Sequence, residues 1–368
     1  MRTTTAALLL LLQWSFSAHA QRAAAESGGS APGVRQYYIA AEEVTWNYAP
    51  RGRNLAGIPH PEIESAEGAG TQTTFLKAVY REYTDATFST PKPRDPRWEH
   101  LGILGPLIRA EVGDLIKVTL KNRTKLMCSM HAHGLQYDKA SEGALYKDGV
   151  DPANKKGSFV PPGGVYTYTW FVPERSGPAS DDGSSVLWMY HGHFMEAKDV
   201  NTGLIGPILI NARGSSKPDG TPIDVDREFI TAFAVFDESS SWYFEANLTR
   251  QKRPFRAVPP GDPVARLPFL MYTINGLIEG NLPALTMKTG ERVRWYMFAS
   301  SNDEDVHTPH WHGQTVLSHH MRTDTIQLTP MGMATADMIA DNPGTWLFHC
   351  HNNDHFEGGM VALFTVLP

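Results

Sequence analysis

Short runs of β-branched and aromatic residues recur between turn residues along this chain. Residues 165–172, with Val, Tyr, Thr, Trp and Phe in sequence, are typical of these runs. Such runs favour β-strands, and their interruption by 32 Gly and 26 Pro predicts many turns. Long helical periodicity is hard to find. The pattern therefore predicts an all-β protein.

The same order of motifs occurs twice along the 368 residues. A polar turn and strand lead to a histidine cluster, a second histidine cluster follows, and an apolar strand closes the unit. The corresponding segments are Val112–Val118 and Thr289–Trp295, Cys128–Gly134 and His307–Gly313, His191–His193 and His349–His351, and Gly203–Ile208 and Gly359–Phe364. This duplication predicts two tandem β-sandwich domains, residues 36–213 and 222–368, joined by the turn-rich segment 214–220.

The N-terminus has the features of a secretory signal peptide. Arg2 precedes the apolar run Ala6–Leu12, and the small-residue site Ala18–Ala20 follows. The run is shorter than the roughly 20 residues that a membrane span needs. We therefore expect a signal peptide at residues 1–20, a disordered lead-in at residues 21–35, and a secreted or periplasmic protein. The net charge of −6 gives no indication of a nucleic-acid partner.

Secretion would normally place cysteines in disulfides, but Cys128 and Cys350, the two cysteines of the chain, each lie inside a histidine cluster. A disulfide is therefore not the default expectation. Asn122 and Asn247 each begin an N-glycosylation acceptor sequence, which predicts a glycoprotein if the source is eukaryotic.

Ten of the 15 histidines fall into four short clusters: His131 and His133; His191 and His193; His307, His310 and His312; His349, His351 and His355. An isolated histidine is usually a surface or core residue, whereas paired clusters with an interleaved cysteine indicate metal sites. Side chains two residues apart share one face of a strand. His349 and His351 should therefore face one way and Cys350 the other.

The same alternation separates two sites. His310 and His312 share a face, and His307 points away from them in a regular strand. His307, Cys350, His355 and Met360 then form the ligand set of a blue-copper electron-transfer centre. Zinc is the alternative metal, but a structural zinc site would not leave eight more histidines in pairs nearby. Those eight suffice for three copper ions and come equally from both halves: His131, His133, His191, His193, His310, His312, His349 and His351.

The first half has no equivalent blue-copper set. Cys128, Gly192 and Leu204 occupy the places of the first histidine, the cysteine and the methionine. We expect no copper at this position. Cys128 should then be a buried free thiol that behaves as a small hydrophobic residue.

At these motifs the sequence resembles the multicopper oxidases, and it is similar to the branch that contains ceruloplasmin, hephaestin and coagulation factors five and eight. The similar segments include Tyr37–Trp46, Ser141–Tyr146, Phe233–Ser239 and Ile274–Leu282. The resemblance implies two cupredoxin-like Greek-key domains and four copper ions per chain. It implies type 1 copper at His307, Cys350, His355 and Met360, type 2 copper at His131 and His310, and a type 3 pair at His133, His191, His193, His312, His349 and His351.

The resemblance also implies an activity and an assembly. Family members couple one-electron oxidation of a substrate at type 1 copper to the four-electron reduction of dioxygen to water at the trinuclear cluster. The coagulation factors are non-catalytic proteins with depleted ligands, and a nitrite reductase would have no purpose for the type 3 histidines, so the complete set favours an oxidase. Two-domain members join domain 1 of one chain to domain 2 of the next, which predicts a homotrimer with intersubunit clusters.

The substrate is less defined by the sequence. Ferroxidase members hold iron near type 1 copper; Asp354 matches one of their residues, whereas Leu267 and Tyr272 stand where two others would be. Residues 303–305 are acidic and either contribute to such a site or form a solvated turn. We expect a metal ion, Fe(II) or Cu(I), as substrate, with Asp354 as the candidate catalytic residue. The alternative is a phenol or aromatic amine, as in laccases.

Overall fold

The computed structural model describes residues 33–58, 72–251, 266–283, 285–300 and 306–368. The expected signal peptide, most of the expected lead-in and residues 303–305 lie outside these ranges. The first strand begins at Val34, so the last two residues of the expected lead-in belong to it. Among the described residues, no helix has the length and apolar character needed to cross a membrane.

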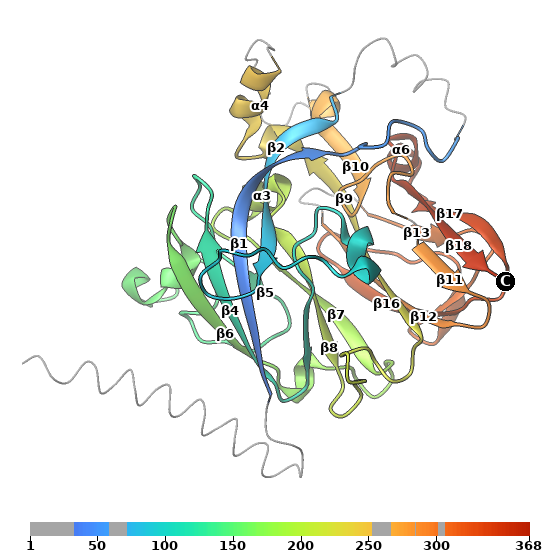
Figure 1. The fold of residues 1–368 in the computed structure, drawn as a ribbon, viewed down its shortest axis with the longest axis horizontal. Coiled ribbons are helices and arrows are strands. Elements are labelled where there is room, and N and C mark those ends of the chain that lie inside the picture. Colours follow the sequence, from blue (N-terminus) through green and yellow to red (C-terminus); the bar gives the residue numbers. More distant parts are fainter. Residues whose placement is uncertain (1–32, 59–71, 252–265, 284, 301–305) are drawn as a thin grey trace, which may run out of the picture.

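Strands form most of the regular structure (Figure 1). They are β1 (Val34–Asn47), β2 (Thr74–Tyr83), β3 (Ile108–Glu111), β4 (Leu115–Asn122), β5 (His131–Ala132), β6 (Val165–Phe171), β7 (Ser185–His191), β8 (Ile205–Asn211), β9 (Arg227–Asp237), β10 (Leu270–Ile274), β11 (Leu285–Lys288), β12 (Arg292–Ala299), β13 (Pro309–Trp311), β14 (Val316–Ser318), β15 (Met321–Thr323), β16 (Met333–Ile339), β17 (Gly344–Cys350) and β18 (Val361–Leu367). The helices are short: α3 (Glu196–Thr202), α4 (Phe244–Arg250), α6 (Asn353–Glu357), and the 3-10 turns η1 (Pro96–Leu101), η2 (Pro152–Asn154), η3 (Lys156–Ser158), η4 (Glu174–Ser176), η5 (Glu238–Ser240) and η6 (Leu267–Phe269). The all-β prediction is confirmed.

The strands form two pairs of sheets. Residues 34–211 supply the sheets β2-β1-β4-β6 and β3-β8-β7-β5, here called the first sandwich. Residues 227–367 supply β10-β9-β12-β16-β14-β15 and β11-β18-β17-β13, the second sandwich. The parallel pairs β1–β4 and β3–β8 recur as β9–β12 and β11–β18. The duplication seen in the sequence is thus a duplication of strand topology.

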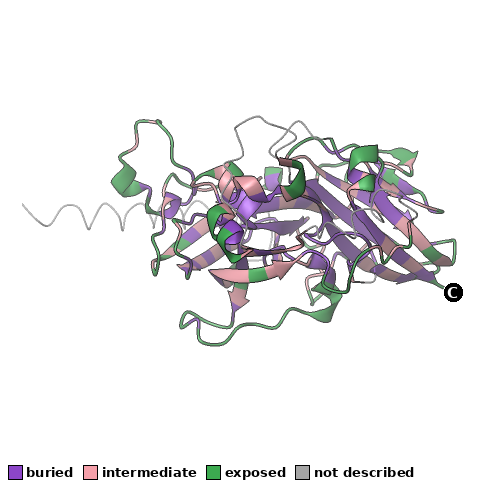
Figure 2. Ribbon diagram, turned by 90° about the horizontal axis from the view of Figure 1, so that it is seen from above, coloured by how far each residue is buried: buried purple, intermediate pink, exposed green. Residues whose placement is uncertain are grey.

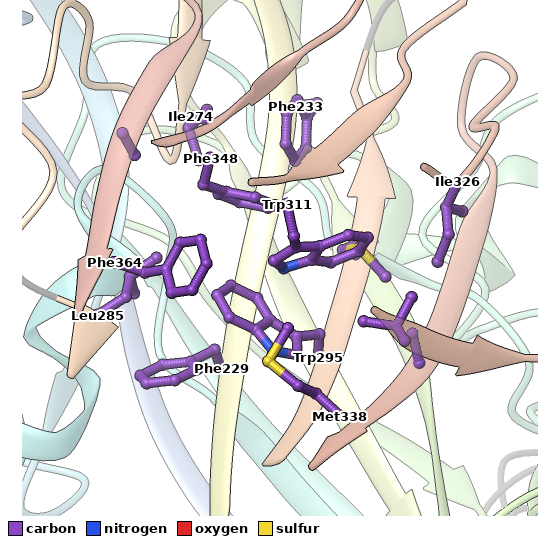
Figure 3. Packing of buried hydrophobic residues seen from close by; sticks show 14 of the residues in the cluster. Phe229, Phe233, Ile274, Leu285, Trp295, Trp311, Ile326, Met338, Phe348 and Phe364 are labelled. Atoms are coloured by element: carbon purple, nitrogen blue, oxygen red, sulfur yellow. The ribbon is translucent and has the colours of Figure 1, made fainter. Parts of the chain in front are cut away.

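Each sandwich encloses an apolar core, with exposed residues confined mainly to loops (Figure 2). In the second sandwich the rings of Trp295, Trp311 and Phe348 pack together (Figure 3), with centroids 5.6 Å apart for the two tryptophans. Rings at 4.5 to about 7 Å in tilted or edge arrangements are favourable contacts. The core therefore fixes β13 and β17, the strands that carry the histidine motifs.

A third apolar core lies between the two sandwiches. Alternate residues of β9 face different cores: Phe229 and Phe233 pack inside the second sandwich, whereas Ile230 and Phe236 pack in the shared core with Leu209 of β8. A strand buried on both faces has no polar alternation, which explains the almost continuous apolar sequence here. The two sandwiches consequently form one packed unit.

The expected glycosylation positions are buried. Asn122 is fully buried, and its Nδ2 donates to the carbonyl oxygens of Leu126 and Val160. Asn247 is also buried, and its side chain bonds both backbone groups of Leu76. Glycosylation of Asn122 would replace one of the two Nδ2 hydrogens that its bonds use. Both side chains thus serve as internal hydrogen-bonding groups, and glycosylation at either position stays a prediction.

Candidate metal centres

The register between β13 and β17 sorts the side chains onto two faces. His310 pairs with His349, and Trp311 pairs with Phe348. Trp311, Phe348 and Cys350 belong to the core of the second sandwich. Because neighbouring side chains of a strand point to opposite faces, His310 and His349 emerge on the other face. The first sandwich repeats this register, with His131 of β5 opposite His191 of β7.

The thiol site consists of His307, Cys350, His355 and Met360, all buried. The ligand atoms of the two imidazoles and the sulfur lie within 4.8 Å of one another, and Cys350 Sγ is 3.5 Å from His355 Nδ1. The Met360 N–H donates to His355 O, and the Cys350 N–H donates to Met360 O. Backbone hydrogen bonds thus bring Cys350, His355 and Met360 together.

The thiol site fits a soft metal ion. Both ring nitrogens of His307 are buried without a hydrogen-bond partner, which is costly for polar atoms unless an ion occupies the site. Burial raises the pKa of the Cys350 thiol, but the nearby imidazoles of His307 and His355 and backbone N–H groups outweigh it and bring the pKa to about 5. A thiolate with two imidazoles and a thioether is a donor set suited to copper.

The second quartet consists of His310, His312, His349 and His351. His312 Nε2 and His349 Nε2 are 3.0 Å apart, and the ring centroids of His310 and His351 are 5.3 Å apart. Burial lowers the pKa of His349 to about 4. Its imidazole is therefore neutral at neutral pH, which is the form that binds metals.

The first quartet, His131, His133, His191 and His193, has the same arrangement. His133 Nε2 and His191 Nε2 are also 3.0 Å apart, and the ring centroids of His131 and His193 are 5.0 Å apart. Burial lowers the pKa of His191 to about 3 and that of His133 to about 4. Two equivalent sets of four imidazoles therefore exist, one on each sandwich.

Backbone carbonyls set the orientation of four of these rings. Nδ1 of His131 lies 2.7 Å from Glu142 O and Nδ1 of His310 lies 2.9 Å from Asp324 O. Nδ1 of His191 and of His349 likewise faces the carbonyl of the next residue. Because a carbonyl only accepts, each Nδ1 carries the proton and each Nε2 keeps its lone pair for an ion.

Glycine ends each histidine pair. Gly134 and Gly313 have φ of +74° and +67°, and a Cβ at either would collide with the ring of Trp188 or Trp346. A residue other than glycine would be strained there and would displace the tryptophan. Trp188 of β7 therefore packs over the glycine that ends the pair His131 and His133, and Trp346 of β17 packs over the glycine that ends the pair His310 and His312.

The two quartets do not meet within the described part of the chain. Ring contacts join the histidines inside each quartet, but none joins one quartet to the other. Their strands, β5 and β13, are drawn well apart in Figure 1. His351 is exposed and the side chain of His193 is 32% exposed, so each quartet is partly open to solvent.

The equivalent of the thiol site in the first sandwich has different chemistry. Cys128 is a free cysteine in the apolar core. Its backbone forms an isolated β-bridge with Val160, as the backbone of His307 does with Leu328. Burial raises the pKa of the Cys128 thiol to about 12. It is the buried free thiol that the sequence predicts.

Sequence comparison misses one residue of this position. The Gly192 N–H donates to Leu204 O, and the Leu204 N–H donates to Asp199 O. In the second sandwich the Cys350 N–H likewise donates to Met360 O, and the Met360 N–H donates to His355 O. Asp199 therefore occupies the place of the second type 1 histidine. The first segment is two residues longer than the second, and this hides the correspondence when the motifs are aligned by spacing.

The positions compared with the iron-holding residues of ferroxidases differ in their surroundings. Asp354 is exposed on α6, and its N–H donates to Asn352 Oδ1. The ring of Tyr272 packs on His355 with centroids 5.5 Å apart, whereas Leu267 is 58% exposed. Asp354 therefore presents an exposed carboxylate directly beside the candidate ligand His355.

The fold and the two kinds of site define a cupredoxin-like protein. The chain belongs to the multicopper oxidase family: profiles of that family match residues 101–215 and 258–368. A solved multicopper oxidase superposes with a TM-score of 0.58 at 18% identity, covering 92% of this chain and 93% of its own. A copper nitrite reductase from Nitrosomonas europaea gives 0.58 at 16% identity, covering 90% and 94%. These likenesses describe the fold alone.

Curated relatives are similar at the level of sequence. The chain is 41% identical to human ferroxidase HEPHL1 over 341 residues and 41% identical to human hephaestin over 346 residues, covering 90% of this chain and 29% of each relative. It is 39% identical to human ceruloplasmin over 345 residues, covering 90% of this chain and 32% of the relative. The chain thus spans about three tenths of the length of these relatives.

The contrast between the two thiols is testable in the metal-free protein. The pKa of Cys350 is about 5 and that of Cys128 is about 12. We expect the ultraviolet absorption of thiolate to rise through a single step near pH 5. Cys350→Ser should remove this step and Cys128→Ser should leave it. A step near pH 9 in the wild type, or its persistence in Cys350→Ser, would contradict the described environment of Cys350.

Proposed function

We propose that this protein is a copper oxidase that takes single electrons from a substrate and delivers them to dioxygen, forming water. The observation that carries the proposal is the covalent adjacency of Cys350, in the thiol site, to His349 and His351, in the second quartet. The thiol site would hold type 1 copper, and the quartets together would hold a type 2 ion and a type 3 pair. Copper would supply one-electron redox chemistry at the first site and oxygen reduction at the second.

The protein's own groups support this division of labour. A buried thiolate and two imidazoles suit both oxidation states of copper, and the buried site excludes water. In the quartets, the Nδ1–carbonyl bonds hold the Nε2 lone pairs ready for ions. The peptide bonds beside Cys350 give electrons a short route from the thiol site to the second quartet.

We further propose a homotrimer in which the first quartet of one chain meets the second quartet of the next. Eight imidazoles suffice for three ions, each quartet supplies four, and each quartet is partly open to solvent. A head-to-tail contact that closes as a ring completes every site. On this proposal the assembled protein holds four copper ions per chain and is exported, as the N-terminal sequence predicts.

For the substrate we propose a metal ion, Cu(I) or Fe(II). The similarity to ferroxidases and the exposed carboxylate of Asp354 beside His355 support it. Leu267 and Tyr272 offer no carboxylate or imidazole at two positions where ferroxidases hold iron, so we expect Fe(II) oxidation to be less efficient than Cu(I) oxidation. A phenol remains the alternative substrate.

Cys350→Ser tests the type 1 assignment. The wild type should bind four coppers per chain and be intensely blue, because thiolate-to-copper charge transfer colours type 1 sites. Cys350→Ser should lose the colour and about one copper while the quartets stay filled; Cys128→Ser should retain both. Copper analysis and visible absorption provide the measurement. A blue Cys350→Ser protein, or one or two coppers in fully loaded wild type, would show the assignment to be wrong.

Mixing two inactive variants tests the assembly. One chain carries His133→Ala and His191→Ala, and the other carries His312→Ala and His349→Ala. If clusters form between chains, a co-assembled mixture contains interfaces with two intact quartets and regains oxidase activity. Mixing two preparations of the same variant is the control and should regain none. Sedimentation of the wild type should give the mass of three chains. An active monomer would contradict the proposed assembly.

Asp354→Asn tests the substrate. If the carboxylate docks a metal ion, KM for Cu(I) or Fe(II) should rise by roughly tenfold, the effect of about 1.4 kcal/mol of lost binding, and phenol oxidation should barely change. Glu357→Gln, an exposed carboxylate on the same helix, is the matched control. A lower kcat and shifted pH profile for phenols alone would assign Asp354 to proton transfer. A hundredfold preference of the wild type for phenols would make the protein laccase-like.

A further inference from the structure

The first sandwich lacks a cysteine at the position of Cys350, yet its quartet has the same arrangement as the quartet of the second sandwich. In the second sandwich the sulfur of Cys350 accepts backbone N–H groups, from Thr308 at 3.3 Å and from Asn352. Gly192 stands at the position of Cys350 and has no side chain to accept anything. Another group must therefore satisfy the N–H of Phe194, which corresponds to Asn352.

Asp199 supplies that group. Its side-chain oxygen Oδ2 accepts the N–H of Phe194 at 2.8 Å and the N–H of Met195 at 3.1 Å. A Cβ added at Gly192 would lie 2.7 Å from Asp199 Cβ and 3.1 Å from Oδ2. The carboxylate thus occupies the space that a side chain at position 192 would enter. Gly192 is required because Asp199 fills its place.

A third donor fixes the other oxygen. Trp242, from the segment after β9, donates its indole N–H to Asp199 Oδ1 at 2.7 Å. Asp199 is fully buried, and a buried carboxylate is tolerated when its oxygens accept hydrogen bonds. Three donors from two parts of the chain therefore lock this side chain in one orientation.

The locked carboxylate acts on a histidine of the first quartet. The N–H of His193 donates to Ser129 Oγ at 2.9 Å, as the N–H of His351 donates to Thr308 Oγ1 at 3.0 Å. The two residues that follow His193 are bound by Asp199. The backbone at His193 is thus held by two groups: the hydroxyl of Ser129, just before β5, and the carboxylate of Asp199 from α3.

We propose that Asp199 is a positioning residue for the first quartet: its carboxylate takes over the structural part of the missing thiolate and holds the turn that presents His193 to the metal ions. The metal-binding part of this inference rests on the proposed function. The hydrogen-bonding part can be tested in the metal-free protein, and the result of that test does not depend on the proposed function.

Asp199→Asn is the first test, because it preserves shape but presents an amide N–H2 to one set of donors. Charge-assisted hydrogen bonds are stronger than those to a neutral amide, so exchange of the Phe194 and Met195 amide protons should accelerate about tenfold or more in the metal-free variant. Asp237→Asn is the matched control, since Asp237 is also buried and caps a turn but contacts neither amide. Unchanged exchange in Asp199→Asn overturns the proposal.

Copper titration of the same variants tests the metal-binding part. Loss of an outer-shell partner typically weakens metal affinity by about 10–100-fold, so Asp199→Asn should lose quartet copper first while the blue absorption of the thiol site stays unchanged. Because His193 is expected to bind the type 3 pair, the number of coppers bound per chain should fall in Asp199→Asn and not in Asp237→Asn. Equal copper affinity and equal copper content in both variants overturn this part. Wild type that binds no copper would contradict the proposed function and leave the exchange result to decide the role of Asp199.

Trp242→Phe is the second variant and tests the same hydrogen bonds if Asp199→Asn does not fold. It removes one donor and leaves the carboxylate and both backbone N–H groups in place. We expect a smaller acceleration confined to the amides of Phe194 and Met195, with a matching small loss of quartet copper. Acceleration spread evenly over the first sandwich, or none at these two amides, overturns the proposal.

Discussion

The pairing register of β13 with β17 is the constraint on which the candidate centres depend. It sets His310 opposite His349 on one face while Trp311, Phe348 and Cys350 point into the core. A shift by one residue would put the imidazoles into the core and the indole into solvent. The cost of that exchange far exceeds the cost of any single lost hydrogen bond. Core packing therefore decides where the metal ligands lie.

Much of this arrangement follows from the sequence because it depends on local periodicity. Alternation along a strand separates Cys350 from His349 and His351, and the repeat of the motifs predicts that Cys128 and His307 are equivalent. Both arguments need only the order of residues. The prediction that Cys128 is buried and free follows from the same repeat, because its counterpart faces the interior.

Other features depend on contacts between distant segments, which periodicity does not reveal. The role of Asp199 requires knowledge of which carbonyl the Leu204 N–H reaches, and the two-residue difference in length conceals it. The orientation of His131 depends on Glu142 O, a backbone atom with no sequence signature. Asn122 matches a glycosylation pattern, yet the side chain is an internal hydrogen-bonding group. Short motifs report chemistry that is available, and tertiary packing determines whether it is accessible.

The double burial of β9 has a consequence for biosynthesis. Synthesis runs from the N-terminus, so residues 34–211 leave the ribosome before β9 exists. Until then the apolar side chains of Leu187, Ile205 and Leu209 have no partner from the second sandwich. An unpaired apolar sheet face promotes aggregation of a nascent chain, and chaperones recognise such surfaces. The strand that unites the two halves also makes the first half dependent on the second during translation.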